Sequence, residues 1–371
     1  MRPVQRLLTF LVLFASAACS AATNSSSSPG GIHPTPTTPD PPTVTPSPTS
    51  SETPTLTSTS TLTPTASPSP EPSPVALMAV GDIMLARTVG ERILEAGPGI
   101  VFANVQEILS TADILAGNLE CAITDQGQPV PKSFTFAAPP LSAQALGLAG
   151  FDIAVLGNNH ALDYGQEGLA QTLQLLGQQG IATVGIGVGV QAAGPLFVEK
   201  NGLRLAFLSY VDVARENIGF DTRDWLATDA LPGIAWAIAE DIQADVASAR
   251  QQADVVIVFM HFGYEGMEMP VQFQRDVAVA AIKAGASAVI GSHPHLLQHV
   301  EIYHGALIAY SLGNFVFDDF DMPENRSAIL RLVLDQNGML SYDWFPVVII
   351  DGLPHPATAE QSAEILRILA P

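Results

Sequence analysis

Short apolar runs rich in β-branched residues alternate with amphipathic stretches of helical length through residues 75–371. Short runs bounded by Gly, Asn or Asp are typical of strands, and apolar residues three or four apart are typical of helices. Such alternation favours an α/β layer fold with buried parallel strands. The predicted strands are 75–80, 112–117, 152–157, 181–187, 203–210, 253–261, 286–291, 307–313, 328–335 and 342–350. The predicted helices are 86–96, 102–111, 141–149, 166–179, 236–252, 270–284 and 360–369.

The order of these elements favours one large domain, residues 75–371, with two sheets. Strands and helices alternate from 75 to about 190 and again from 236 to 291. The last strands follow one another without long helices, which indicates an antiparallel portion. A single mixed α/β domain is therefore the favoured architecture, and two separate α/β domains are the alternative.

The N-terminal segment has the features of a secretory signal. Arg2 and Arg6 precede an apolar run at 7–18, which is too short to span a bilayer. The following Ser-Ala-Ala-Cys resembles the lipobox of bacterial lipoproteins, in which the cysteine is acylated. We therefore expect residues 1–19 to be a lipoprotein-type signal peptide. Acylation of Cys19 would anchor the protein to the bacterial membrane on its extracytoplasmic side; cleavage and secretion without a lipid is the alternative.

Residues 20–74 consist almost entirely of Ser, Thr, Pro and Ala, and no Lys or Arg occurs between Arg6 and Arg87. Such a segment cannot offset its chain entropy by burying apolar surface, which predicts a disordered linker. A partly polyproline-like chain of this length would reach on the order of 100 Å. Its predicted role is that of a spacer between the anchor and the folded domain.

The chain is strongly acidic, with a formal net charge of −21. Only Asp40, Glu52 and Glu71 of its acidic residues precede residue 75, so the charge belongs to the folded part. A surface of this sign argues against nucleic acid and anionic lipid as partners, and it is compatible with binding cations. Cys121 is the other cysteine besides Cys19, and we expect it to be a small buried residue.

Polar residues repeatedly follow the predicted strands. In layered α/β folds the carboxyl ends of the strands meet at one edge, where ligands gather. Each such residue by itself also fits a turn former, a helix cap or a hydrogen-bonded buried histidine. His293 and His295 favour a shared ligand site over separate local roles. Residues two apart in an extended segment share a face, and Pro294 restricts the backbone between them. The residues concerned are Asp82, Glu120, Asn159, His160, His261, His293, His295 and Asn314.

Carboxylates together with imidazoles predict a metal centre at this edge. Nitrogen and oxygen donors suit a divalent Zn, Mn or Fe ion, and a shared carboxylate allows two ions about 3.5–4 Å apart.

Six motifs in this order resemble the CapA family of capsule and poly-γ-glutamate synthesis proteins. They are GDIMLAR, GNLECAIT, LGNNHALDYG, MHFGYE, GSHPHLLQ and YSLGNFVFD, and they extend from about Ala76 to Asp318. That family is similar to the calcineurin-like metallophosphoesterases, so the resemblance implies a four-layer αββα sandwich of two mixed sheets.

The resemblance also implies roles for individual residues. It implies Asp82, Glu120, Asn159, His261, His293 and His295 as metal ligands. His160 would contact the substrate or its leaving group as the catalytic residue, and Arg87 and Asn314 are candidate substrate-binding residues. Two departures from the phosphoesterase pattern are Met84, where a histidine ligand is usual, and Glu120, where aspartate is usual. One metal position thus keeps its ligands, and the second lacks an imidazole because of Met84.

Three functions fit these observations. The first is a surface-anchored, metal-dependent hydrolase or transferase acting on an anionic polymer or a phosphate-containing substrate. The second is a non-catalytic, membrane-tethered accessory or polymer-binding subunit of a capsule or polyglutamate synthase or export complex. The third, a solute-binding lipoprotein, leaves the clustered histidines without a role. An acidic domain repels poly-γ-glutamate unless cations or a basic patch intervene, which weakens the idea of a passive polymer cradle.

Overall fold

The computed structural model describes residues 72–214, 220–318 and 320–371. The predicted signal peptide, Cys19 and nearly all of the predicted linker lie outside these residues. In the part that is described, no helix has the length and apolar character needed to cross a membrane.

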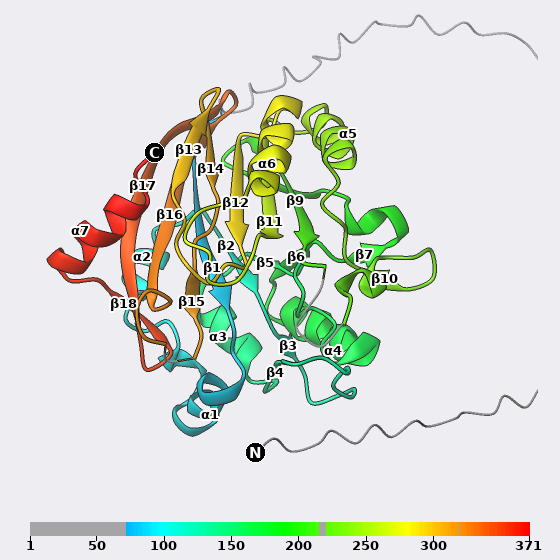
Figure 1. The fold of residues 1–371 in the computed structure, drawn as a ribbon, viewed down its shortest axis with the longest axis vertical. Coiled ribbons are helices and arrows are strands. Elements are labelled where there is room, and N and C mark those ends of the chain that lie inside the picture. The colour runs from blue at the N-terminus through cyan, green and yellow to red at the C-terminus, as the bar shows by residue number, and fades with distance from the viewer. Residues whose placement is uncertain (1–71, 215–219, 319) are drawn as a thin grey trace, which may run out of the picture. The chain divides into compact units, whose positions relative to one another are not determined.

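Two large mixed sheets carry the fold (Figure 1). Sheet I has a parallel half, in which β1, β2, β5 and β6 lie side by side, and an antiparallel half, in which β16, β17 and β18 extend from the other edge of β1. The short β15 pairs in parallel with the end of β1. The strands are β1 (Val75–Ile83), β2 (Ile114–Leu119), β5 (Ile153–Val155), β6 (Ala182–Val184), β15 (Asn314–Val316), β16 (Arg326–Asp335), β17 (Gly338–Ile350) and β18 (Leu353–Pro356).

Sheet II has four parallel central strands, β9, β11, β12 and β14, with an antiparallel strand, β8 or β13, at each edge. Its strands are β8 (Leu196–Lys200), β9 (Leu203–Asp212), β11 (Val255–Phe262), β12 (Ala288–Ser292), β13 (Val300–Tyr303) and β14 (Ala306–Ala309). Two further pairs of short strands lie in the loops, namely β3 (Ala122–Ile123) with β4 (Ala137–Ala138) and β7 (Gly187–Val188) with β10 (Pro232–Gly233).

Helices cover the outer faces of both sheets. In Figure 1, α5 and α6 lie beside β9, β11 and β12, and α7 lies beside β17. The helices are α1 (Arg87–Ala96), α2 (Gln106–Leu109), α3 (Ser142–Ala149), α4 (Gly165–Gln178), α5 (Ala239–Arg250), α6 (Gln272–Ala284) and α7 (Ala359–Ile368).

The alternation of side chains along β1 shows how the layers pack. Leu77 and Ala79 belong to a buried cluster that includes Phe207 and Ile257 of sheet II, so the two sheets share one core. Met78 points to the opposite face and belongs to a second cluster with residues of α1 and α3. A third cluster joins sheet II to α5 and α6. Period-two alternation thus supplies both faces of each sheet, and the predicted four-layer αββα sandwich is confirmed.

Two predicted elements need correction. The helix predicted at 102–111 is only the four-residue α2, because the chain between 101 and 105 forms turns. Val101, Val105 and Leu109 nevertheless lie buried in the same cluster, so turns satisfy the apolar spacing that favoured a helix. The strand predicted at 181–187 is split into β6 and β7, since Gly185 adopts a φ of 88°, outside the extended region.

Candidate metal centre

Asp82 lies at the end of β1, where the backbones of β1 and residue 313 approach closely. Its amide donates to the carbonyl oxygen of Gly313 at 2.9 Å. A Cβ on Gly81 would overlap that same carbonyl, so only glycine permits the approach. The Asp82 carboxylate is fully buried and accepts a hydrogen bond from Asn118 Nδ2 at 2.8 Å. The other carboxylate oxygen accepts from the backbone amide of His293 at 3.3 Å, which links the ends of the two sheets.

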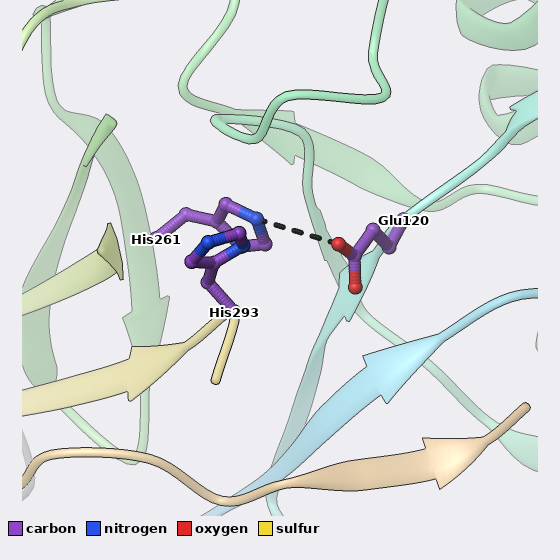
Figure 2. Close-up of side chains that lie close together, drawn as sticks. All are labelled: Glu120, His261 and His293. Carbon is purple, nitrogen blue, oxygen red and sulfur yellow. Dashed lines mark ion pairs between the residues drawn. The ribbon is translucent and has the colours of Figure 1, made fainter. Parts of the chain in front are cut away.

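Glu120 follows β2 and extends its side chain toward sheet II. Figure 2 shows its carboxylate directed at His261 and His293, and the dashed line marks the 3.4 Å contact to His261 Nε2. The side chain is fully buried, and neither carboxylate oxygen has a hydrogen-bond partner among the described residues. An ionised carboxylate buried without hydrogen-bond donors costs several kcal/mol unless a cation compensates it.

His261 lies within β11, where its ring is held from both sides. Nδ1 is 2.9 Å from the Ser292 hydroxyl, and Nε2 is 2.8 Å from the side-chain oxygen of Asn159, which follows β5. The Asn159 amide oxygen and the Glu120 carboxylate therefore meet the same imidazole nitrogen. These contacts bring potential metal-ligand atoms of sheet I, from Glu120 and Asn159, next to His261 of sheet II.

His293 and His295 follow β12, both with left-handed backbones, φ 97° and 58° respectively. This conformation costs roughly 1–2 kcal/mol for each non-glycine residue, and such strain clusters at functional sites. His293 Nδ1 is buried without a hydrogen-bond partner among the described residues. His295 Nδ1 lies 2.9 Å from Asn314 Oδ1 and 3.3 Å from Asp82 Oδ2. Asn314 thus orients His295. The substrate contact predicted for Asn314 stays a prediction.

Burial and neighbouring charge shift the pKa values of these groups strongly. Burial lowers the pKa of His261 to about 3 and, with the adjoining histidines, that of His293 well below its usual value, so both rings are neutral. Burial, reinforced by the charge of Asp82, raises the pKa of Glu120 well above its ordinary value. Burial opposes a charge on His295, but Glu120 and Asp82 outweigh it and raise the pKa of His295 to about 10. A proton on His295 would balance the negative charge of Asp82 and Glu120, as a bound metal cation would.

The donor set fits a divalent metal. Three groups of side chains bring one ligand atom each within 4.8 Å of one another. They are Glu120 with His261 and His293, Asp82 with Glu120 and His295, and Glu265 with His293 and His295. Neutral imidazoles and unpartnered carboxylate oxygens are the ligands that Zn²⁺, Mn²⁺ and Fe²⁺ take. A divalent ion is therefore consistent with the buried atoms that lack partners.

Met84 does not face this cluster. Its side chain is fully buried in the apolar core beneath α1, and its sulfur accepts the backbone N–H of Ala86 at 3.2 Å. The position that carries a histidine in the phosphoesterase pattern is here part of the hydrophobic core. Met84 therefore differs from the phosphoesterase histidine in position as well as in residue type, because its side chain lies in the apolar core.

His160 is fixed by a buried network next to the centre. Its Nδ1 lies 2.7 Å from Asp163 Oδ2, and Phe136 stacks on its ring at 4.2 Å. Asp163 also pairs with Lys132 at 2.8 Å, with both side chains fully buried. Lys132 Nζ in turn donates to the Asn159 carbonyl at 2.5 Å, so it ties the Asn-His pair to the same network.

Arg87 lies at the rim of the centre. Its guanidinium pairs with Asp318 at 2.5 Å and sits 4.6 Å above the Phe136 ring, on a side chain that is 39% exposed. Arg87 begins α1 with a left-handed φ of 51°. The residue is thus held near His160 by way of Phe136, and its predicted substrate contact stays a prediction.

A cavity of about 740 Å³ opens over the cluster. His293 and Glu265 line it, together with Phe134, Asp212 and Tyr264. This volume accommodates a segment of a polymer or a small phosphate-bearing molecule.

Sequence reasoning missed Lys132 and Phe136. Lys132 lies in a Pro-rich loop where a surface lysine is the ordinary expectation, and no spacing relates it to Asp163. Only the tertiary contacts reveal that both side chains are buried together. Cys121, expected to be buried, is a free and fully buried thiol whose pKa burial raises to about 12.

Comparisons with known proteins agree with the motifs. The sequence model of the family described as "Bacterial capsule synthesis protein PGA_cap" matches residues 76–319. The chain is 32% identical over 281 residues to the "PGA biosynthesis protein CapA" of Bacillus subtilis, covering 75% of this chain and 72% of that protein. It is 31% identical over 294 residues to the "Capsule biosynthesis protein CapA" of Bacillus anthracis, covering 77% and 70%. A crystal structure described as a novel phosphatase, from Mycoplasma pneumoniae, aligns with a TM-score of 0.48 at 11% identity over 79% of this chain and 97% of that one.

Proposed function

The chain belongs to the bacterial capsule synthesis protein family, and from that premise we propose that it is a metal-dependent hydrolase or transferase of capsule or poly-γ-glutamate synthesis. One observation carries the proposal: buried atoms of Glu120 and His293 that lack hydrogen-bond partners converge, and His293 lines a cavity. A buried polar atom without a hydrogen-bond partner costs free energy, which a bound cation would return here.

In this proposal, one set of residues binds metal and another residue donates a proton. Asp82, Glu120, Asn159, His261, His293 and His295 would hold the divalent cation or cations. When bound, such a cation supplies Lewis-acid polarisation of a phosphoryl or carbonyl oxygen. His160 would give a proton to the leaving group, since the contact of Nδ1 with Asp163 fixes the ring and leaves Nε2 as the other proton-carrying atom.

The substrate we propose is an anionic polymer or a phosphate-containing molecule. The formal charge of −21 repels polyanions over most of the surface. Arg87 lies over the Phe136 ring and Lys132 Nζ lies 3.4 Å from His160 Nδ1, but each of these cations is paired with a carboxylate, Asp318 and Asp163 respectively. A divalent cation bound at the centre would thus supply the positive charge that an acidic substrate needs in order to approach.

The proposed enzyme is tested by metal content and turnover together. Purified full-length protein is expected to retain a divalent transition metal, and His293→Ala and Asp82→Ala are expected to lose it. Turnover of a model phosphodiester or of γ-glutamyl polymer should fall at least about 100-fold in His160→Ala, because one general acid contributes on the order of 10²–10⁴. Metal content in that variant should be unchanged.

The outcomes separate the candidate functions. Absence of bound transition metal from the wild-type protein would overturn the metal-dependent enzyme. Metal without turnover of either substrate would favour the accessory subunit of a synthase or export complex.

We also propose that the domain is held outside the cytoplasm by a lipid on Cys19. The charged, apolar and small-residue order of residues 1–19 supports this, and the Pro-rich residues 20–74 would serve as the spacer. Expressed in a bacterial host with its own signal, the wild-type protein should sediment with membranes and label with a radioactive fatty acid. Cys19→Ser should lose the label and leave the membrane fraction. A labelled Cys19→Ser variant, or an unlabelled wild-type protein, would contradict the anchor.

A further inference from the structure

We propose that Glu265 is a ligand of a second divalent cation and takes the place of the imidazole that Met84 does not provide. The inference rests on the proposed metal-dependent function. It assigns one further residue to the centre, in the loop between β11 and α6, and it predicts two cations where the loss of a histidine would otherwise leave one.

The first support is the position of the carboxylate. A Glu265 oxygen and ring nitrogens of His293 and His295 all lie within 4.8 Å of one another. His293 brings to this group a nitrogen that is buried and has no hydrogen-bond partner among the described residues. Two imidazoles and a carboxylate are a common first coordination set for zinc and related metals.

The second support is the anchoring of the loop that carries Glu265. The amide of Gly266 donates to the carbonyl of Pro294 at 3.0 Å, so the loop is bonded to the residue between the two histidines. Gln298 Nε2 donates to the carbonyl of Met267 at 2.8 Å. These bonds hold the two residues that follow Glu265 against the segment 294–298, which contains His295.

The third support is the negative charge around the histidines and the exposure of Glu265 to the cavity. Asp82 and Glu120 already place two buried carboxylates beside the histidines, and Glu265 adds a third from the cavity wall. A cation bound between Glu265 and the two histidines would reduce the repulsion among these carboxylates. Because Glu265 is exposed, the second cation would be bound at the side open to the cavity, where a substrate oxygen can reach it.

The test is a titration of the metal-free, full-length protein with Mn²⁺ by calorimetry, with metal counted independently by mass spectrometry. The wild-type protein is expected to bind two ions. Glu265→Gln should keep the tighter ion and bind the other at least about 10-fold more weakly, because loss of even a group that only supports a metal ligand typically costs about 10–100-fold in metal affinity. Glu268→Gln is the matched control, since it removes an exposed carboxylate of the same loop that belongs to none of the ligand groups.

Each result has a distinct meaning. Two ions of unchanged affinity in Glu265→Gln would overturn the role of Glu265 and leave the proposed metal-dependent function intact. A single ion in the wild-type protein would overturn the second position. No ion in the wild-type protein would overturn the proposed function itself, and this inference with it. If Glu268→Gln weakened the binding of the second Mn²⁺ ion equally, the loss would reflect the general negative charge of the loop. That result would also contradict the proposal.

Discussion

Replacing Glu120 by glutamine is expected to abolish the thermal stabilisation that the protein gains from Mn²⁺. Glu120 belongs to two of the three ligand groups, so its loss removes a ligand from both of those groups at once. A cation at about 100 times its Kd stabilises the folded state by about 2.7 kcal/mol, which corresponds to a rise of several degrees in Tm for a domain of this size. The variant should show no such rise.

The metal-free variant should be at least as stable as the metal-free wild-type protein. Both Glu120 oxygens are buried without hydrogen bonds among the described residues, so a neutral amide of the same shape breaks no hydrogen bond and places no ionised carboxylate in the interior. Tm measured by differential scanning calorimetry, with and without Mn²⁺, tests both statements. Glu167→Gln, an exposed carboxylate in the first turn of α4, is the control and should keep the full Mn²⁺ effect. An undiminished Mn²⁺ shift in Glu120→Gln would exclude Glu120 as a ligand.

Lys132→Met should be the most destabilising of the substitutions considered, by about 3–5 kcal/mol. The ammonium group and the Asp163 carboxylate are both fully buried and 2.8 Å apart, and removing one partner leaves the other charge in the interior. Methionine has nearly the same length and no branching, so the packed volume changes little. Lys283→Met, at the exposed end of α6, should change stability by less than about 0.5 kcal/mol.

A double-mutant cycle with Asp163→Asn separates the ion pair from the packing. Asparagine can still accept the Phe136 amide, which now donates to Asp163 at 2.7 Å. The double variant should therefore be more stable than the sum of the single effects predicts, by more than about 1 kcal/mol. Urea unfolding of the four proteins measures this coupling. Strictly additive losses would show that Lys132 and Asp163 do not act as a pair.

Several features of the centre were predictable because they depend on local pattern. Asp82, Asn159, His261 and His293 each follow or end an apolar run, and the carboxyl ends of parallel strands meet at one edge of a sheet. His293 and His295 also stood out through their spacing around Pro294. Their left-handed backbones were not predictable, because nothing local in the sequence demands a positive φ at histidine.

The edge strands show where local pattern fails. β8 and β13 were not predicted, since strands at the edge of a sheet expose half of their side chains and carry a weak apolar signal. The helix expected at 102–111 is mostly turns, because burial of Val101, Val105 and Leu109 does not require continuous helical hydrogen bonds.

The sequence by itself determined the layer fold, the family and the set of residues that converge, since apolar periodicity and ordered motifs are properties of the chain. The tertiary structure decided how the two sheets oppose each other, which joins Asp82 of one sheet to the His293 amide of the other. It also placed Met84 in the core, Lys132 beside Asp163, and Glu265 beside the histidines. These are contacts between residues distant in the chain, and they depend on packing and burial that no local pattern encodes.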